Sequence, residues 1–399
     1  MRRTLGWTAG CLLLAGPLAA QQRVARADAI DAALARGARG AFARADTQAA
    51  AGLLHGARLY PNPALSATYT KDTPHYHLIA DVPLDLPWLR SARVGAAAAG
   101  RDASRFRFDF ERAAIRYDVD TTYTHALAAL AHAGLSRRTA QAADTLLAMA
   151  RLRRSVGDVS ELDVRLAEIN AGQMANAAAD DSLASVATVL AVQLAMGLAA
   201  DSQTIVLADT LVPPLDTAPP AAALGEPLLV AAAAAQLRSE ERNLSLAHRN
   251  VFPAPSFQVG VEFGDPGGQR GSLPTFGLAL PIPLFHRNGG EVAQARAARA
   301  RAQAELDLAR REQTAELERA RRTYAVATAR VTRDRVLLAG SDQVAAMSLQ
   351  AYREGAVPLA TVLEAQRLAR EALGRFVDDM AAANDAVDLL RLLTARSAP

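Results

Sequence analysis

The sequence predicts a mostly α-helical chain made of two similar halves, each with one β-hairpin beside a very long helix. The first observation is repetition: Pro83 and Pro281 lie 198 residues apart, and several other motifs keep the same offset. The second is that the ranges 91–154 and 289–352 contain no proline, so nothing there forces a helix to end. A repeat of this length joins two copies of one supersecondary unit into a single object.

The first twenty residues have the features of a targeting segment. Arg2 and Arg3 precede an apolar run that ends in small residues at Ala20, so 1–20 is predicted to be a secretory signal peptide. Lipoprotein cleavage before Cys11 is the alternative, although most of the apolar run follows that residue. Cleavage after Ala20 would remove the chain's single cysteine, which excludes disulfide bonds and a thiol nucleophile.

The charge distribution argues against a nucleic-acid partner. The chain has 44 Lys and Arg residues against 41 Asp and Glu, and Lys71 is its only lysine. The arginines alternate with acids along the chain and form no basic patch. Hydrophobic content of 51% is largely alanine, and aromatic content is only 5%. This composition favours closely packed helices over a thick aromatic core.

Two regions alternate apolar and polar residues with period two, and predict hairpins at about 62–87 and 254–286. The apolar series of the first region is Tyr76, Leu78, Ala80, Val82 and Leu84. The second region has two such series, Phe257, Val259, Val261 and Phe263, and then Phe276, Leu278, Leu280 and Ile282. Strands of about ten residues match a tilted strand that crosses a bilayer. The alternative is a pair of small soluble hairpins.

A seven-residue apolar repeat predicts long coiled-coil helices at about 91–154 and 289–352. Its positions are Leu317, Tyr324, Val331, Leu338, Ala345 and Tyr352 in the second half, and Val119, Ala126, Ala133, Ala140 and Leu147 in the first. At 1.5 Å per residue each helix would be roughly 95 Å long. Alanines and serines beside the seam allow close approach of neighbouring helices.

Each long helix is expected to end at a glycine turn and to be followed by a returning helix. Gly157 and Gly355 suit a left-handed helix C-terminus. Ser160 suits an N-cap and Pro358 a first helical position. The returning helices are predicted at about 161–196 and 359–395. The apolar run Leu183–Ala200 is long enough to suggest a membrane span, but its polar interruptions and alanines favour a helix buried against other helices.

The predicted organisation is therefore a signal peptide at 1–20 and a first repeat at 21–200. A Pro- and Ala-rich linker follows at 201–222, and a second repeat at 223–399. An N-terminal helix at about Val24–Leu59 corresponds to one at Gly225–Asn250.

The sequence shows no pattern typical of an enzyme. It contains no Gly-rich phosphate loop and no His-Glu-x-x-His zinc motif. His75 and His77 are close together, but a turn in contact with solvent explains them better than a metal site, because zinc needs three or four donors. We therefore expect no cofactor and no catalytic centre.

The two hairpins and two turns resemble those of the outer-membrane efflux family, the TolC-like channels. The resemblance is carried by Asn62-Pro63-Ala64-Leu65, Pro281-Ile282-Pro283-Leu284-Phe285-His286-Arg287-Asn288-Gly289-Gly290, Val156-Gly157-Asp158-Val159-Ser160 and Tyr352-Arg353-Glu354-Gly355. It covers essentially the whole mature chain, and the Pro-Leu-Phe-x-Arg-Asn-x-Gly segment is most similar to the heavy-metal branch.

The resemblance implies a homotrimer in the outer membrane, in which each protomer gives four strands to a twelve-stranded barrel and its helices to a periplasmic tunnel. Trimerisation agrees with physics, because four strands leave two open edges that lipid does not tolerate. The apolar faces would meet lipid, while Ser66, Thr68, Gln258 and Glu262 would face the lumen.

The resemblance also suggests roles for individual turn residues. Gly157, Val159, Ser160, Gly355 and Val357 correspond to a tip that contacts a periplasmic adaptor protein. Asp163, Tyr352 and Glu364 correspond to a periplasmic gate, with a hydrogen bond expected between Asp163 and Tyr352. In the family, an acid often stands at the position of Thr361, and a channel-closing arginine can lie at the position of Val357. The ring of acidic residues at the constriction of the tunnel is therefore expected to be weaker here.

The leading functional hypothesis is a passive exit duct that joins an adaptor to an energised inner-membrane pump of the RND type. The alternative is a soluble periplasmic coiled-coil scaffold, or a protein that binds lipid surfaces with its helices. The sequence does not distinguish metal ions from drugs as cargo.

Overall fold

The computed structural model describes residues 22–199, 205–214, 225–251, 254–264 and 272–397. The signal peptide with Cys11, most of the linker and the 265–268 turn lie outside the described residues. The chain divides into two compact units. One comprises 34–118, 213–335 and 382–399 and contains the main sheet; the other comprises 1–33, 119–212 and 336–381 and contains both glycine turns.

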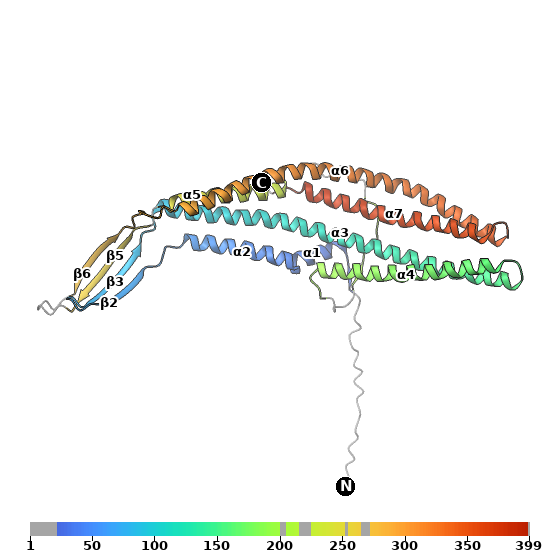
Figure 1. Cartoon of the computed structure of the whole chain (residues 1–399), viewed down its shortest axis with the longest axis horizontal. Helices are drawn as coiled ribbons and strands as arrows, with labels where there is room; N and C mark the ends of the chain where they lie inside the picture. Colours follow the sequence, from blue (N-terminus) through green and yellow to red (C-terminus); the bar gives the residue numbers. More distant parts are fainter. Residues whose placement is uncertain (1–21, 200–204, 215–224, 252–253, 265–271, 398–399) are drawn as a thin grey trace, which may run out of the picture. The chain divides into compact units, whose positions relative to one another are not determined.

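The two predicted hairpins form a single antiparallel sheet. Its strands are β2 (Ala64–Tyr69), β3 (Tyr76–Pro83), β5 (Ser256–Phe263) and β6 (Leu273–Ala279), in the order β2-β3-β5-β6 (Figure 1). The hairpins join through β3 and β5, whose register pairs His77 with Glu262 and Asp81 with Gln258. Among the described residues, β2 and β6 have no partner on their outer edges.

The two faces of this sheet differ in polarity as the alternation predicts. Large apolar side chains of one face are exposed: Leu65, Tyr69, Tyr76, Val82, Phe257, Val259, Val261, Phe263, Phe276 and Leu278. The other face carries Ser66, Thr68, His77, Asp81, Gln258 and Glu262. The strands have six to eight residues and not ten. Pro83 ends β3 and Pro281 follows β6, and proline cannot donate a ladder hydrogen bond.

The helices of the sheet-containing unit are α2 (Ala38–Arg58), α5 (Leu228–Arg249) and the first parts of α3 (Pro87–Ser155) and α6 (Gly289–Arg353). The predicted single helix at Val24–Leu59 is two helices, because α1 (Arg26–Arg36) stops before Gly37, whose backbone is extended. At the start of α3, the buried carboxylate of Asp85 pairs with Arg93 at 2.9 Å and Arg90 at 3.5 Å.

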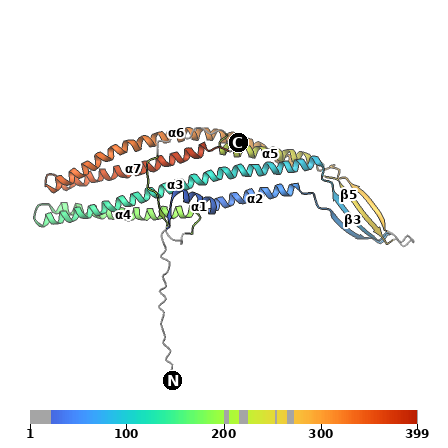
Figure 2. The ribbon, with the colours of Figure 1, turned by 180° about the vertical axis from the view of Figure 1, so that it is seen from behind.

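The other unit contains α4 (Glu161–Ala195), most of α7 (Leu359–Thr394) and the last parts of α3 and α6. Helix α4 runs beside α3, and α7 beside α6, in both views (Figure 1, Figure 2). A short parallel pair, β1 (Arg23–Val24) and β4 (Val206–Leu207), brings the start of the described chain to the linker. Buried Tyr123 fixes this pair: its Oη lies 2.8 Å from both the Val24 carbonyl and an Asp209 carboxylate oxygen.

The heptad seam packs as predicted, since every seam residue in α3 and α6 is buried or half-buried.

Helix α4 is packed against its neighbours less completely. By length and composition, it is the one described helix apolar enough to cross a membrane, yet only 22% of that window is buried in the chain. Ala167, Val189 and Val192 pack inward, whereas Leu183 is 71% and Leu194 is 77% exposed. The prediction of a helix buried against other helices therefore holds for one face of α4, and the opposite face is exposed in the single chain.

Candidate functional site

The two glycine turns have the same backbone structure. In the first, Gly157 N–H donates to Arg154 O at 3.0 Å and the next N–H donates to Arg153 O at 2.9 Å. In the second, Gly355 N–H and the N–H after it make the corresponding bonds at 3.0 and 2.8 Å. Both glycines have left-handed φ angles, +81° and +75°. This double bond pattern is the Schellman motif, which caps the last carbonyls of α3 and α6.

A capping box starts the returning helix after the first turn. Ser160 Oγ accepts from Asp163 N–H at 3.1 Å, and the Asp163 carboxylate accepts from Ser160 N–H at 3.1 Å and Ser160 Oγ at 2.7 Å. The carboxylate of Asp163 is therefore committed to the helix start. Val159, between the turn and the cap, is half-buried, and its carbonyl accepts from Arg154 Nη1 at 3.4 Å.

Tyr352 lies in the apolar core that joins the two turns. Its side chain is 2% exposed and packs with Leu146, Ala150, Ala167, Leu359 and Val362. Burial raises the pKa of the Tyr352 hydroxyl above its usual value, because the phenolate would lose its hydration there. The nearby Arg153 guanidinium opposes that rise. Tyr352 is thus a neutral core residue as well as the last aromatic residue of α6.

Arg153 connects the two turns through three contacts. Its Nε donates to Asp158 at 2.6 Å, its Nη1 donates to the Tyr352 carbonyl at 2.7 Å, and its guanidinium lies 4.8 Å from the Tyr352 ring centroid. Charge-assisted hydrogen bonds of this kind contribute about 1.5–3 kcal/mol. One side chain from α3 therefore holds the end of α6 against the first turn.

The expected hydrogen bond between Asp163 and Tyr352 is not present. Within the described part of the chain Tyr352 Oη has no hydrogen-bond partner, and the Asp163 carboxylate faces its own helix cap. The capping box competes with Tyr352 for the Asp163 carboxylate and satisfies it within its own helix start. Sequence reasoning missed Arg153, although an arginine five residues before Asp158, across a helix end, is a signal for a side chain that folds back over the turn.

The acid expected at the constriction is also paired. Glu364 lies 2.7 Å from Arg367 one turn along α7, and this guanidinium lowers the pKa of its carboxyl. Both side chains are exposed. Thr361 is exposed near the start of α7. Its backbone N–H donates to Pro358 O at 3.1 Å. Because α7 begins at Leu359, Pro358 precedes the helix and is not its first residue. Val357 is half-buried against the core of the turns.

The surfaces of the two turns differ although their backbones match. The first turn exposes Leu152, Val156 and Leu162, with Val156 75% exposed. The equivalent positions of the second turn, at the repeat offset, are Gln350, Glu354 and Ala360. The first turn therefore presents an apolar surface and the second a polar one. Sequence reasoning singled out the glycines and overlooked these apolar residues.

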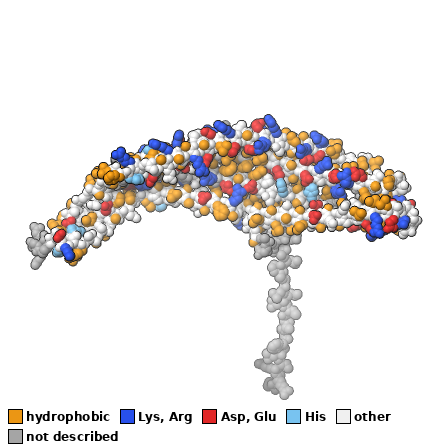
Figure 3. All heavy atoms as spheres, viewed as in Figure 1, with side chains coloured by type: hydrophobic (Ala, Val, Ile, Leu, Met, Phe, Trp, Pro, Cys, Tyr) orange, Lys and Arg blue, Asp and Glu red, His pale blue; other side chains and the backbone are white. Residues whose placement is uncertain are grey.

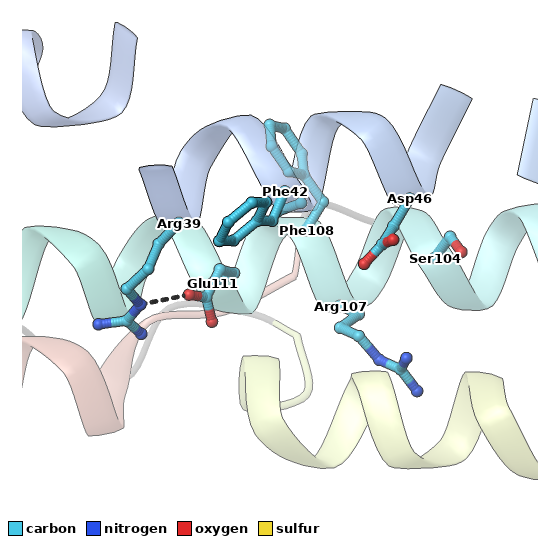
Figure 4. Close-up of a pocket in the computed structure, with 8 residues that line it drawn as sticks. Arg39, Phe42, Asp46, Ser104, Arg107, Phe108 and Glu111 are labelled. Carbon is cyan, nitrogen blue, oxygen red and sulfur yellow. Dashed lines mark hydrogen bonds and ion pairs between the residues drawn. The ribbon is translucent and has the colours of Figure 1, made fainter. Parts of the chain in front are cut away.

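Outside the two turns, the described residues include the histidine pair noted in the sequence and pockets between helices. They contain no group of three or more His, Cys, Asp or Glu side chains placed to hold a metal ion. His77 instead lies 3.3 Å from Glu262, and His75 bonds the Thr70 carbonyl. A pocket of about 210 Å³ between α2 and α3 is lined by Phe42, Phe108 and several charged side chains (Figure 4). It is smaller than usual ligand pockets, and the Arg39–Glu111 bond closes part of it.

Comparisons with known proteins agree with this architecture. No family model matches the chain. It is 26% identical over 331 residues to the cobalt-zinc-cadmium resistance protein CzcC of Cupriavidus metallidurans, covering 80% of this chain and 78% of that protein. A solved membrane protein from Pseudomonas aeruginosa superimposes with a TM-score of 0.77 at 21% identity, covering 92% of this chain and 93% of that one. The Campylobacter jejuni CmeC outer membrane channel gives 0.78 at 15%, covering 92% and 85%.

The chain has the fold of a TolC-like outer-membrane channel. The resemblance inferred from the sequence is confirmed, and so is the fold class of a helical protein with a small β-sheet. The similarity to CzcC also agrees with the heavy-metal branch suggested by the Pro-Leu-Phe-x-Arg-Asn-x-Gly segment. Within this TolC-like fold, the roles of the turn residues stay predictions.

We predict that the left-handed glycines of the TolC-like fold resist replacement. Gly157→Ala and Gly355→Ala should each lower the stability by about 1–2 kcal/mol, since a Cβ is strained at positive φ. Asn at the same positions should cost less, because it tolerates that region. Thermal unfolding in detergent, followed by circular dichroism, measures whether stability decreases from glycine to asparagine to alanine at these positions.

Gly172→Ala is the matched control, because this glycine lies inside α4 with open space where a Cβ would be. It should be neutral or slightly stabilising. Equal effects of alanine at Gly172 and Gly157 would show that the turns are not held in their left-handed conformation.

Proposed function

We propose that this protein is the outer-membrane exit channel of a tripartite efflux system. One observation carries the proposal: a four-stranded sheet exposes an apolar face and two open edges, and each of its hairpins precedes one uninterrupted helix of 69 or 65 residues. An apolar sheet face of this kind is suited to lipid, and long helices after each hairpin are suited to a tunnel. The similarity to CzcC and to the CmeC outer membrane channel supports it.

The assembly is proposed to be a homotrimer. Open strand edges are not tolerated in lipid, and three copies of four strands close a barrel of a size that leaves a channel. The exposed face of α4 supports the same conclusion. Leu183 and Leu194 would become buried only against a neighbouring copy, since no described element of the chain covers them.

The partners are proposed to be a periplasmic adaptor protein and an inner-membrane pump of the RND type. The adaptor would contact the two glycine turns, with the exposed Leu152, Val156 and Leu162 of the first turn as its apolar anchor. Transport through such a duct needs no catalytic residue, so no enzymatic activity is proposed. Divalent metal cations are the proposed cargo, because the curated relative is a cobalt-zinc-cadmium resistance protein.

The soluble periplasmic scaffold is the second candidate, and the sheet argues against it. A soluble protein would expose ten large apolar side chains on one sheet face, which is an aggregation hazard without lipid. Membrane fractionation and planar-bilayer recording test the two hypotheses together. A channel fractionates with the outer membrane and conducts ions after purification; a scaffold is recovered in periplasmic extract and gives no conductance.

Cargo is tested separately in cells that lack the gene. Loss of the channel should lower tolerance to zinc, cobalt and cadmium, and expression of the full chain should restore it. Normal metal tolerance together with increased sensitivity to drugs would reject the metal cargo and leave the channel function intact.

We predict that charges on the exposed face of α4 prevent trimer assembly. The double variant Leu183→Asp/Leu194→Asp would bury two carboxylates per copy in an apolar interface, at a cost of several kcal/mol. The purified protein should then be a monomer by light scattering in detergent, whereas the unmodified chain is expected to be a trimer. Ser182→Asp, on the same helix, is the control and should leave the trimer intact. A trimeric double variant would place the interface elsewhere.

We predict that Arg153 holds the gate closed. Arg153→Gln removes contacts worth about 1.5–3 kcal/mol, which shifts a two-state closed–open equilibrium by tenfold or more towards the open state. Single-channel conductance in planar bilayers should rise. Arg151→Gln is the control, because Arg151 is on the same helix and, among the described residues, pairs only with Glu168.

Tyr352→Phe should leave the conductance unchanged, since the Tyr352 hydroxyl has no hydrogen-bond partner among the described residues. A rise with Tyr352→Phe and none with Arg153→Gln would restore the original assignment of the gate to Asp163 and Tyr352.

A further inference from the structure

A ring of exposed aromatic and aliphatic side chains marks the junction of the sheet with its helices. We call it the junction collar; its apolar members are Tyr60, Leu84, Trp88, Ile282, Leu284 and Phe285. They come from the α2–β2, β3–α3 and β6–α6 connections and, for Trp88, from the first turn of α3. Phe285 is fully exposed, at 100%. Exposed aromatic residues where an apolar surface ends are typical of a membrane–water interface.

The same collar has an excess of positive charge. The ranges 55–60, 84–93, 246–251 and 280–291 hold five arginines but only two acids, Asp85 and Glu291. Asp85 is buried and already paired with Arg90 and Arg93. Blue basic side chains lie beside orange hydrophobic ones where α5 and α6 meet the strands (Figure 3). The described turn at the other end of β3, at 70–75, balances one lysine with one aspartate.

Two of these arginines are held next to the exposed aromatic residues. Arg90 lies 4.3 Å from the Tyr60 ring centroid and donates to its hydroxyl at 2.9 Å. Arg249 donates to the Trp88 carbonyl at 2.8 Å and to Ser91 Oγ at 3.3 Å through Nη1. Among the described residues the other guanidinium nitrogens of Arg249 have no hydrogen-bond partner and remain able to donate. Arg287 is exposed beside Phe285.

We propose that the junction collar binds the head groups of anionic phospholipids in the leaflet that adjoins the helices. The inference rests on the proposed membrane function and adds a preference for a lipid class. Guanidinium groups bind phosphate with two parallel hydrogen bonds, and an arginine near a bilayer surface attracts anionic lipid. The apolar strand face continues directly into the collar, so acyl chains on that face would bring their head groups to these arginines.

A second copy of the chain is a weaker candidate for the occupant. In an assembly of identical chains it would bring further arginines to the same level, and like charges repel. An anionic head group neutralises that charge and leaves the aromatic rings of the collar at the membrane–water interface, where they are most stable.

The fluorescence of a tryptophan can report on the environment of this collar. It has two tryptophans, Trp7 and Trp88. After the predicted cleavage at Ala20, Trp88 is the only one, so its fluorescence reports the collar alone. The purified mature protein is reconstituted in phosphatidylcholine vesicles. Trp88 quenching by brominated phosphatidylglycerol is then compared with quenching by brominated phosphatidylcholine.

We expect phosphatidylglycerol to quench Trp88 preferentially, and added salt to reduce the preference. Arg249→Gln/Arg287→Gln should reduce the relative affinity for phosphatidylglycerol about fivefold per arginine removed. Arg311→Gln/Arg322→Gln is the matched control: both are exposed arginines of α6 that make no ion pair with the described residues, and the charge change is the same. It should leave the preference unaltered.

The outcomes separate this inference from the proposed function. Equal quenching by the two lipids, unaltered in the collar variant, overturns the inference and leaves membrane insertion established. Absence of quenching by either lipid in a protein that conducts ions shows that a neighbouring copy covers the collar, which also overturns it. Absence of both quenching and conductance contradicts the proposed channel itself.

Discussion

Unsatisfied strand edges are the constraint on which the rest of this molecule depends. Strands β2 and β6 each present a row of backbone groups to the outside, and one face of the sheet presents apolar side chains. Open strand edges are a liability in water and are not tolerated in lipid, and the exposed apolar face is unstable in water. The proposed closure by further copies would remove the edges and place the apolar face against acyl chains. The bare face of α4 has the same consequence in the helical part.

The features predicted well from the sequence are those set by local and periodic chemistry. Strand alternation, proline-free helices and the turn glycines each follow from backbone preferences, and the structure gives Gly157 and Gly355 the positive φ that their positions require. The heptad seam is covered for the same reason: a seven-residue apolar repeat places its apolar residues along one face of a helix, which packs against neighbouring helices.

The features predicted poorly depend on which of several partners a side chain selects. Asp163 was assigned to Tyr352 but caps its own helix, because Ser160 is three residues away and always within reach. Arg153 was not identified, since its acceptors are a turn residue and a backbone carbonyl 199 positions further on. Gly37 separates α1 from α2 inside a pattern that looks continuous. Such choices depend on tertiary geometry that residue spacing does not contain.

The matching turns have a consequence for symmetry. Each chain ends its two long helices with the same Schellman backbone but with different surfaces, apolar around Val156 and polar around Glu354. Three chains would therefore display six turns that approximate sixfold symmetry in their backbone and obey only threefold symmetry in their side chains. Any ring of six identical subunits placed on them would meet two chemically distinct surfaces in alternation. In the proposed assembly, duplication followed by divergence would thus give one gene product two chemically different turn surfaces.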